Sequence, residues 1–324
     1  MITIKKWLTL IATSMLAVSV SATAQAQTLR LGHVTPPSHI WHKVAERFND
    51  NLKEATNNKD SLRIYPLSKL GGDNQMIAML QAGSIQFAVL TAGSLSNRSE
   101  SMNAWFMPYI FRDVAHAAEV AQSREAQQML VELRKHKLVG LGYTMAGMRH
   151  LLSTSEIKTT DDFAGKKIRS FPNKLFSQWW SDLGAAPTAL AISDVSPALT
   201  TNLLDGVDVD LDIVVGLKMY QQAPYLTLTN HMAFPGVVVA SEKWWNTQSD
   251  EKKQQVIKAF KEAESWGYQQ QIAAEKKNLA FLKSVGVTVS ALDGDALEQV
   301  GHRIRSEYVN DHPEISGFLK SAQR

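Results

Sequence analysis

Short apolar segments alternate with amphipathic segments along most of this chain, and this alternation constrains the fold more than any other feature. Residues 38–55, for example, carry apolar side chains three and four positions apart, a spacing typical of one helix face. The first series predicts strands at residues 28–33, 62–65, 85–90 and 138–145, with helices at 38–55, 73–82 and 115–137. Such a series forms a mostly parallel sheet with both faces covered.

A second series of the same kind follows. It predicts strands at residues 167–171, 186–189 and 206–213, with helices at 173–183 and 193–203. Residues 227–240 are interpreted as one or two strands that cross back to the first series. Two such series predict an α/β fold with two lobes, in which a ligand binds in the cleft between them, near the carboxyl ends of the strands.

A long amphipathic segment after the second series predicts a helix at residues 249–285. Ser249 can cap this helix, and Asp250 and Glu251 lie where the helix dipole favours acidic side chains. At about 1.5 Å per residue the helix would be about 50 Å long, so we expect it to span both lobes. The predicted organisation is lobe I at 27–148, lobe II at 149–230, a crossover to lobe I at 231–248, the long bracing helix at 249–285, and a C-terminal segment at 286–324 that packs on the body.

The N-terminal segment has the features of a secretory signal peptide. Lys5 and Lys6 precede an apolar run at residues 7–22, and the small residues of Ala24-Gln25-Ala26 suit cleavage after Ala26. The apolar run is too short, and too interrupted by Thr and Ser, for a transmembrane helix. We therefore predict a signal peptide at residues 1–26 and a mature protein in the periplasm, without direct insertion into the membrane.

Composition narrows the range of partners. The chain has 34 Lys and Arg, 31 Asp and Glu, and no cysteine. Cleavage after Ala26 removes two of the lysines and leaves 32 basic and 31 acidic side chains. Because no Lys/Arg block is present, nucleic acid is not an expected partner. Without cysteine there is neither a lipid-anchoring N-terminal cysteine nor a disulfide framework.

Two arginines lie near the ends of two predicted strands, which the two series bring toward one cleft. Arg149 comes after Gly147-Met148, and Arg169 ends the segment Lys166-Lys167-Ile168-Arg169. The planar guanidinium group donates two parallel hydrogen bonds to a carboxylate and stays charged at physiological pH. A small organic acid is therefore the first ligand class to consider, although either arginine can also be a surface or interlobe ion-pair partner.

Together with other segments, these motifs resemble the extracytoplasmic solute-binding proteins of TRAP transporters, the DctP family. The resemblance covers nearly all of the mature chain. It depends on the order and spacing of Leu31-Gly32-His33, Leu70-Gly71-Gly72-Asp73, Met107-Pro108-Tyr109-Ile110-Phe111, Asp162-Phe163-Ala164-Gly165, Leu183-Gly184-Ala185-Ala186-Pro187-Thr188 and Leu204-Asp205-Gly206.

The resemblance implies a two-lobed periplasmic-binding-protein-like fold with a ligand cleft between the lobes. It implies a protein that captures a small organic acid, closes over it and delivers it to TRAP membrane permease subunits, without chemistry on the ligand and without a cofactor. Within the family motifs, Arg169 is implied as the principal carboxylate anchor and Arg149 as an assisting residue. We expect a monomer.

Two other functions remain open from the sequence. A periplasmic partner that signals the bound ligand to a membrane receptor would use the same cleft. A secreted enzyme is disfavoured, because the chain has no Gly-x-Ser-x-Gly, no His-Glu-x-x-His and no thiol nucleophile. The nine histidines are scattered along the chain, so no metal site is predicted.

Five further residues match ligand-contacting positions of the family more loosely, and their residue types also serve in helix caps and loop packing. Asn173 begins the helix after the strand that ends near Arg169, where an amide can reach the same carboxylate. The others are Thr91 and His231 at later strand ends, and His33 and Ser38 between the first strand and the next helix, whose N-terminus is a weak anion site.

Asp208, Asp210 and Asp212 alternate with apolar residues, which an extended segment would place on one face. Three alternatives stay open for them: a solvated face or salt bridges to lysines, hydrogen bonds that one or more of these acids, Asp208 and Asp210 first, accept from hydroxyl or amine groups of the ligand, and a bound cation. The pairs at 179–180 and 244–245 are expected to put one tryptophan in the core and one at an edge, because adjacent helix positions diverge by about 100°. An aromatic acid therefore stays open beside sugar acids, hydroxy or oxo acids and dicarboxylates.

Overall fold

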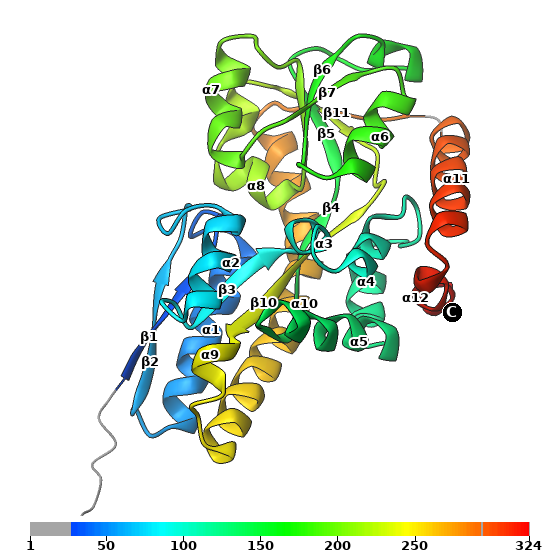
Figure 1. Cartoon of the computed structure of the whole chain (residues 1–324). Helices are drawn as coiled ribbons and strands as arrows, with labels where there is room; N and C mark the ends of the chain where they lie inside the picture. The colour runs from blue at the N-terminus through cyan, green and yellow to red at the C-terminus, as the bar shows by residue number, and fades with distance from the viewer. Residues whose placement is uncertain (1–26, 293, 324) are drawn as a thin grey trace, which may run out of the picture.

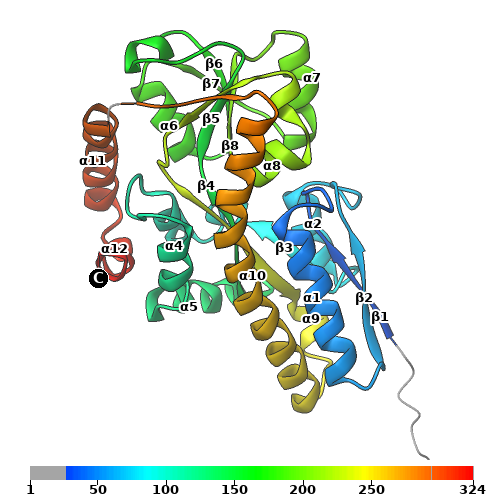
Figure 2. The ribbon, with the colours of Figure 1, turned by 180° about the vertical axis from the view of Figure 1, so that it is seen from behind.

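The structure, a computed structural model, describes residues 27–292 and 294–323. The predicted signal peptide at residues 1–26 lies outside the described residues. The described chain forms two lobes, each built around one β-sheet, and a long helix runs along both of them (Figures 1 and 2). The predicted two-lobed α/β fold with a bracing helix is therefore confirmed.

The first lobe contains a five-stranded sheet in the order β2-β1-β3-β10-β4. Its strands are β1 (Gln27–Gly32), β2 (Asp60–Tyr65), β3 (Phe87–Thr91), β4 (Leu138–Met148) and β10 (Ala233–Ser241). β1, β2 and β3 are parallel, whereas β10 runs antiparallel to both of its neighbours. The α-helices of this lobe are α1 (Ile40–Ala55), α2 (Asp73–Ala82), α3 (Ala92–Ser96), α4 (Val114–Val120), α5 (Arg124–Glu132) and α9 (Glu242–Trp245).

The second lobe contains a six-stranded sheet in the order β11-β9-β5-β8-β6-β7. Its strands are β5 (His150–Ser153), β6 (Lys167–Ser170), β7 (Ala186–Ala189), β8 (Gly206–Val209), β9 (Tyr225–Leu228) and β11 (Thr288–Ala291). Its α-helices are α6 (Lys174–Asp182), α7 (Val195–Thr200) and α8 (Leu211–Gly216). β5, which the sequence did not predict, runs antiparallel to β8 and β9, so each sheet is mixed rather than purely parallel.

The bracing helix is α10 (Asp250–Ser284), which has 35 residues. Ser249 caps it as predicted, because its hydroxyl accepts a hydrogen bond of 3.2 Å from the backbone N–H of Lys252. α10 packs on α1 and β4 of the first lobe and on α8 of the second, and Figure 2 shows this path from behind. Among the described residues, no helix combines the length and the apolar composition needed to cross a membrane.

The C-terminal segment makes a second connection between the lobes. After β11, α11 (Gly294–Asp311) packs on α6 of the second lobe. α12 (Ser316–Ala322) then packs on α4 and α5 of the first lobe, as Figure 1 shows at the side of the molecule. The two lobes are therefore linked by two strand crossovers, after β4 and after β9, and by two helical segments.

The prediction of one strand at residues 206–213 was wrong. β8 ends at Val209, and α8 begins at Leu211 because Asp210 caps it. The Oδ1 atom of Asp210 accepts a hydrogen bond of 2.9 Å from the backbone N–H of Ile213. Such a bond to the following backbone competes with an extended conformation. The alternating aspartates therefore do not share one strand face.

The prediction of one helix at residues 115–137 was also wrong, because two helices, α4 and α5, occupy this region. Ser123 starts the second of them, and its hydroxyl accepts a hydrogen bond of 3.2 Å from the backbone N–H of Ala126. A serine followed by helix-forming residues is a capping signal, and it separates the two helices here.

The expectation that each tryptophan pair has one ring at an edge was wrong as well. Trp179, Trp180, Trp244 and Trp245 are all buried. α6, which carries the first pair, packs against β6 and β7 on one side and α11 on another, so both diverging rings are covered. None of these four side chains lines the interlobe cavity described next.

Candidate ligand-binding cavity between the lobes

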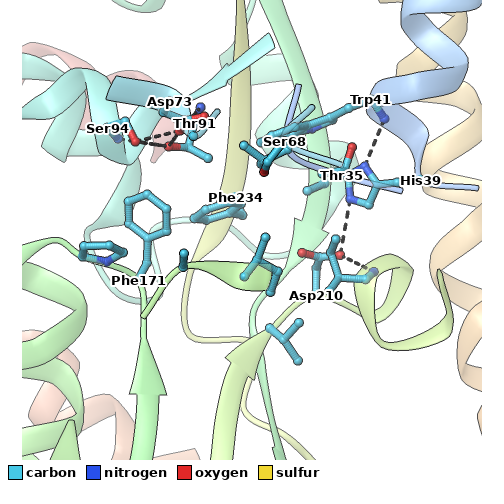
Figure 3. Close-up of a pocket in the computed structure, with 18 of the residues that line it drawn as sticks. Thr35, His39, Trp41, Ser68, Asp73, Thr91, Ser94, Phe171, Asp210 and Phe234 are labelled. Atoms are coloured by element: carbon cyan, nitrogen blue, oxygen red, sulfur yellow. Dashed lines mark hydrogen bonds and ion pairs between the residues drawn. The ribbon is translucent and has the colours of Figure 1, made fainter. Parts of the chain in front are cut away.

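A cavity of about 230 Å³ lies between the two lobes, where several strands end. The first lobe contributes the loop before α1, the start of α2, and the end of β3. The second lobe contributes the end of β6 and the junction of β8 and α8. Figure 3 shows side chains from both lobes converging on this space, with Phe171 and Phe234 among its aromatic lining.

Arg169 is the one cation in the described wall of this cavity that has no acidic partner. It stands in β6 and is only 3% exposed. Its Nε atom donates a hydrogen bond of 2.9 Å to the carbonyl oxygen of Leu190, and no carboxylate among the described residues pairs with it. Burial and the nearby charge of Arg149 lower the pKa of Arg169 to about 9. The site therefore keeps a buried cation without a partner of opposite charge.

Arg149, by contrast, is fully engaged within the protein. Its Nε atom donates to Asp208 Oδ1 at 2.5 Å, and Nη1 donates to Asp210 Oδ2 at 3.3 Å. Nη2 donates to the backbone carbonyl of Asp208. The guanidinium carbon also lies 4.4 Å from the centre of the Phe234 ring, a cation–π contact. Arg149 lines the cavity, but its donors already serve protein acceptors.

Asp208 lies behind Arg149 in a buried network and does not line the cavity. Its Oδ2 atom accepts from Trp180 Nε1 at 2.8 Å and lies 3.1 Å from Nε2 of His231. Burial alone would raise the pKa of Asp208, but Arg149 and His231 hold that pKa well below its ordinary value. Asp208 is thus an ionised partner of Arg149, and His231 supports it while stacking on Trp179.

Asp210 lines the cavity and joins the lobes. Besides capping α8, it lies 3.6 Å from Nε2 of His39 in the first lobe, as Figure 3 shows. The Nδ1 atom of His39 accepts from the backbone N–H of Trp41 at 3.1 Å, so the proton of a neutral ring lies on Nε2, which faces Asp210. Burial opposes ionisation of Asp210, but the neighbouring His39 and the charge of Arg149 hold the pKa of Asp210 below its ordinary value.

Asp212 does not line the cavity and serves another role. Its Oδ2 atom accepts a hydrogen bond of 2.7 Å from the backbone N–H of Ile40, the first residue of α1. Its Oδ1 atom accepts from Asn278 of α10 at 3.0 Å. A carboxylate is stabilised at a helix N-terminus, so this contact ties the second lobe to the first. The described residues include no group of three or more His, Cys, Asp or Glu arranged to hold a metal ion.

The remaining predicted residues are distributed unevenly. Thr91 lines the cavity, where its hydroxyl donates to Asp73 Oδ2 at 2.5 Å. Asn173 caps α6 and donates to Ser96 and Asn103, away from this cavity.

His33 and Ser38 also lie outside the cavity lining. His33 is fully buried, with its ring nitrogens 2.9 Å from Thr35 Oγ1 and 2.9 Å from His42 Nδ1. Burial, followed by the charges of His42 and His39, lowers the pKa of His33 to about 3. Ser38 is exposed. Of the nine predicted residues, the structure therefore brings Arg169, Arg149, Asp210 and Thr91 together around the cavity.

Several lining residues were not singled out from the sequence. The most prominent are Asp73, His39, Trp41, Phe171 and Phe234. The sequence did contain a signal for Asp73, because this acidic residue follows Gly71-Gly72 and begins a predicted helix. In the structure its carboxylate lies beside Thr91, at the end of β3. The aromatic residues carried none, since apolar side chains in a strand or helix are most often ordinary core residues.

Comparison with known proteins places most of the described chain in one family. The family model for bacterial extracellular solute-binding protein, family 7, named DctP, matches residues 31–310. The chain is 29% identical over 311 residues to the 2,3-diketo-L-gulonate-binding periplasmic protein YiaO of Escherichia coli, covering 94% of each chain. It is 28% identical over 308 residues to the sialic acid-binding periplasmic protein SiaP of Vibrio cholerae, covering 94% of this chain and 95% of that one.

Solved structures agree with these relatives. A TRAP periplasmic solute-binding protein from Xanthobacter autotrophicus, with bound β-D-galacturonate, superimposes with a TM-score of 0.86 at 25% identity. The match covers 91% of this chain and 99% of that chain. The family model, the relatives and the shared fold agree, and the chain belongs to the DctP family of TRAP transporter solute-binding proteins.

Proposed function

We propose that this protein is the solute-binding component of a TRAP-type transporter and captures a small organic acid in the cavity between its lobes. The observation that carries the proposal is the state of Arg169, a buried guanidinium in the cavity wall without a carboxylate partner in the described chain. Removing a charge from water is costly unless a counter-charge pairs with it. A ligand carboxylate supplies that counter-charge.

The magnitude of such a contact is sufficient for useful binding. A hydrogen bond to a charged group contributes about 1.5–3 kcal/mol. Micromolar affinity corresponds to about 8 kcal/mol. Two parallel bonds from Arg169 to one carboxylate would therefore supply roughly half of that free energy. The aromatic and polar lining would supply the rest.

The relatives support an acidic ligand. The proteins named above are described as binding 2,3-diketo-L-gulonate and sialic acid, and the solved structure contains galacturonate. All three are described as periplasmic binding proteins, which supports a periplasmic location for this chain. Its proposed partners are TRAP membrane permease subunits, to which it delivers the ligand as a monomer. No chemistry on the ligand is part of this proposal.

The direct test is ligand binding by the mature protein from residue 27, after unfolding and refolding to remove bound ligand. Calorimetry or thermal shift is measured with organic acids and with the neutral amides of the same acids. We expect binding of acids only, and loss of that binding in R169A. R303A is the matched control, because Arg303 forms an exposed ion pair of 3.0 Å with Asp182. Normal binding by R169A would contradict the anchor assignment.

Uptake in a deletion strain separates transport from sensing. Loss of the gene should abolish uptake of the bound acid, and the wild-type chain should restore it. If uptake continues unchanged while a response to the acid disappears, the protein is a sensing partner and the transport proposal is wrong.

A further inference from the structure

Besides Nε2 of His39, which faces Asp210 at 3.6 Å, two buried polar atoms in the first-lobe wall of the cavity have no hydrogen-bond partner among the described residues. They are Oδ1 of Asp73 and the indole Nε1 of Trp41. The two side chains are 9% and 1% exposed, and both line the cavity. Buried polar atoms are nearly always paired in folded proteins. Because these two atoms belong to the cavity wall, one acceptor and one donor are available to polar groups of a ligand.

The Asp73 carboxylate is held in a fixed orientation. Its Oδ2 atom accepts from the hydroxyl of Thr91 at 2.5 Å, the hydroxyl of Ser94 at 2.7 Å and the backbone N–H of Thr91 at 3.1 Å. Figure 3 shows this group at one side of the cavity. Because three donors fix Oδ2, the other oxygen is left as a preorganised acceptor. Four more polar side chains line the same lobe's wall: Thr35, Ser68, Asn74 and Gln75.

The charges around the cavity limit how many carboxylates it can hold. Its described lining contains two cations, Arg149 and Arg169, and Arg149 is already paired with Asp208 and Asp210. Arg169 can pair with one ligand carboxylate. A second carboxylate would be buried without a counter-ion, whereas a hydroxyl group can donate to Asp73 and accept from Trp41.

We propose that the cavity selects a hydroxylated monocarboxylic acid, such as a sugar acid, and discriminates against dicarboxylates and unsubstituted acids of the same length. The ligand carboxylate pairs with Arg169, and ligand hydroxyl groups complete the hydrogen bonding of Asp73 and Trp41. This inference rests on the proposed function, which requires only that an acid binds. Asp73 is then the residue that determines specificity, while Arg169 provides the anchor.

Calorimetry with length-matched acids tests the selectivity. One set is gluconate, hexanoate and adipate, and a shorter set is threonate, butyrate and succinate. In at least one set, the hydroxylated acid should bind at least tenfold more tightly than both others. The inference is overturned if, in both sets, the dicarboxylate or the unsubstituted acid binds as tightly as the hydroxylated acid or more tightly. If that binding is lost in R169A, the proposed function is left intact. Absence of binding by every acid overturns both.

Two variants test the residues. D73N should weaken binding of the hydroxylated acid at least tenfold and reduce its advantage over the unsubstituted acid, because an amide nitrogen replaces the free acceptor. D182N is the control, since Asp182 forms only a surface ion pair with Arg303. W41F removes one hydrogen-bond donor and should weaken binding of the hydroxylated acid threefold to tenfold. This second variant tests the assignment if D73N does not fold. Unchanged selectivity in the folded variants overturns the assignment.

Discussion

Replacing Arg169 by methionine should make the ligand-free protein more stable, although it should abolish ligand binding. Burial, together with the charge of Arg149, lowers the pKa of Arg169 to about 9. The ordinary value is above about 12, and one pKa unit corresponds to about 1.4 kcal/mol, so keeping this group charged at neutral pH costs up to about 4 kcal/mol. The cost applies at every pH below about 9, because the folded-state pKa is the lower one.

Methionine keeps most of the aliphatic volume of arginine and carries no charge. The substitution gives up the hydrogen bond from Nε to the carbonyl of Leu190, which contributes about 1 kcal/mol. We therefore expect R169M to raise the free energy of unfolding of the ligand-free protein by about 1–3 kcal/mol.

R149M is the matched control for this experiment. The two arginines are equally buried, at 2% and 3% exposure, but only Arg149 has carboxylate partners. Removing it leaves Asp208 and Asp210 as buried charges without a cation, so we expect a loss of about 3–5 kcal/mol. The two substitutions should therefore change stability in opposite directions.

Urea unfolding of refolded, ligand-free protein at pH 7 measures both effects. Tryptophan fluorescence and circular dichroism must give coincident transitions, because a two-lobed protein need not unfold in one step. If R169M is destabilised as strongly as R149M, Arg169 is an ordinary structural residue. The argument that an unpaired buried cation awaits a ligand would then be wrong.

Three further predictions concern the strand crossover after β4, the part of α10 that packs on β4, and the motion of the lobes. Burial and the charge of Asp210 raise the pKa of Glu275 to about 8, so only the folded state keeps this proton between about pH 4.5 and 8, and the free energy of unfolding should fall as pH rises through that range. E275Q should remove this pH dependence and be about 1–3 kcal/mol more stable than the wild type at pH 8, as measured by urea unfolding. The same pH dependence in both proteins would contradict the prediction. Gly147 has a φ of +122°, and a Cβ at this position would overlap the side chain of Glu275. Gly165 also has a positive φ, of +70°, but a Cβ there would meet no other atom. G147A should therefore lower the melting temperature more than G165A. X-ray scattering should give a smaller radius of gyration with ligand, and an unchanged radius at saturation would argue against closure.

The sequence predicted the parts of the fold that depend on long periodic segments. The bracing helix was predicted because it has a serine cap, acidic residues in its first turn and a long amphipathic pattern. The strand predicted at 206–213 failed because Val207-Asp208-Val209-Asp210 has the alternation of a strand, whereas the side chain of Asp210 bonds to the backbone three residues ahead. Local capping chemistry prevailed over the alternating pattern.

The candidate site was only partly predictable, because the sequence does not show which charges pair. Arg149 and Arg169 look alike in the sequence, since each lies near the end of a predicted strand and follows a glycine-containing motif. Their difference depends on β5, a strand of four residues that no sequence signal revealed. β5 pairs antiparallel with β8 and sets Leu151 opposite Asp208, which brings the preceding Arg149 beside that carboxylate. Arg169 enters from β6 and meets no acid.

The contacts between the lobes explain why this difference matters for binding. The lobes are already joined by Asp212 at the N-terminus of α1 and by Asp210 beside His39, and neither contact requires a ligand. A ligand favours the closed state only through interactions that it makes more strongly there. Arg149 can add little, because its partners are in place beforehand. Arg169 from one lobe and Asp73 from the other have unused capacity, so an acid that reaches both of them gains its differential affinity from closure itself.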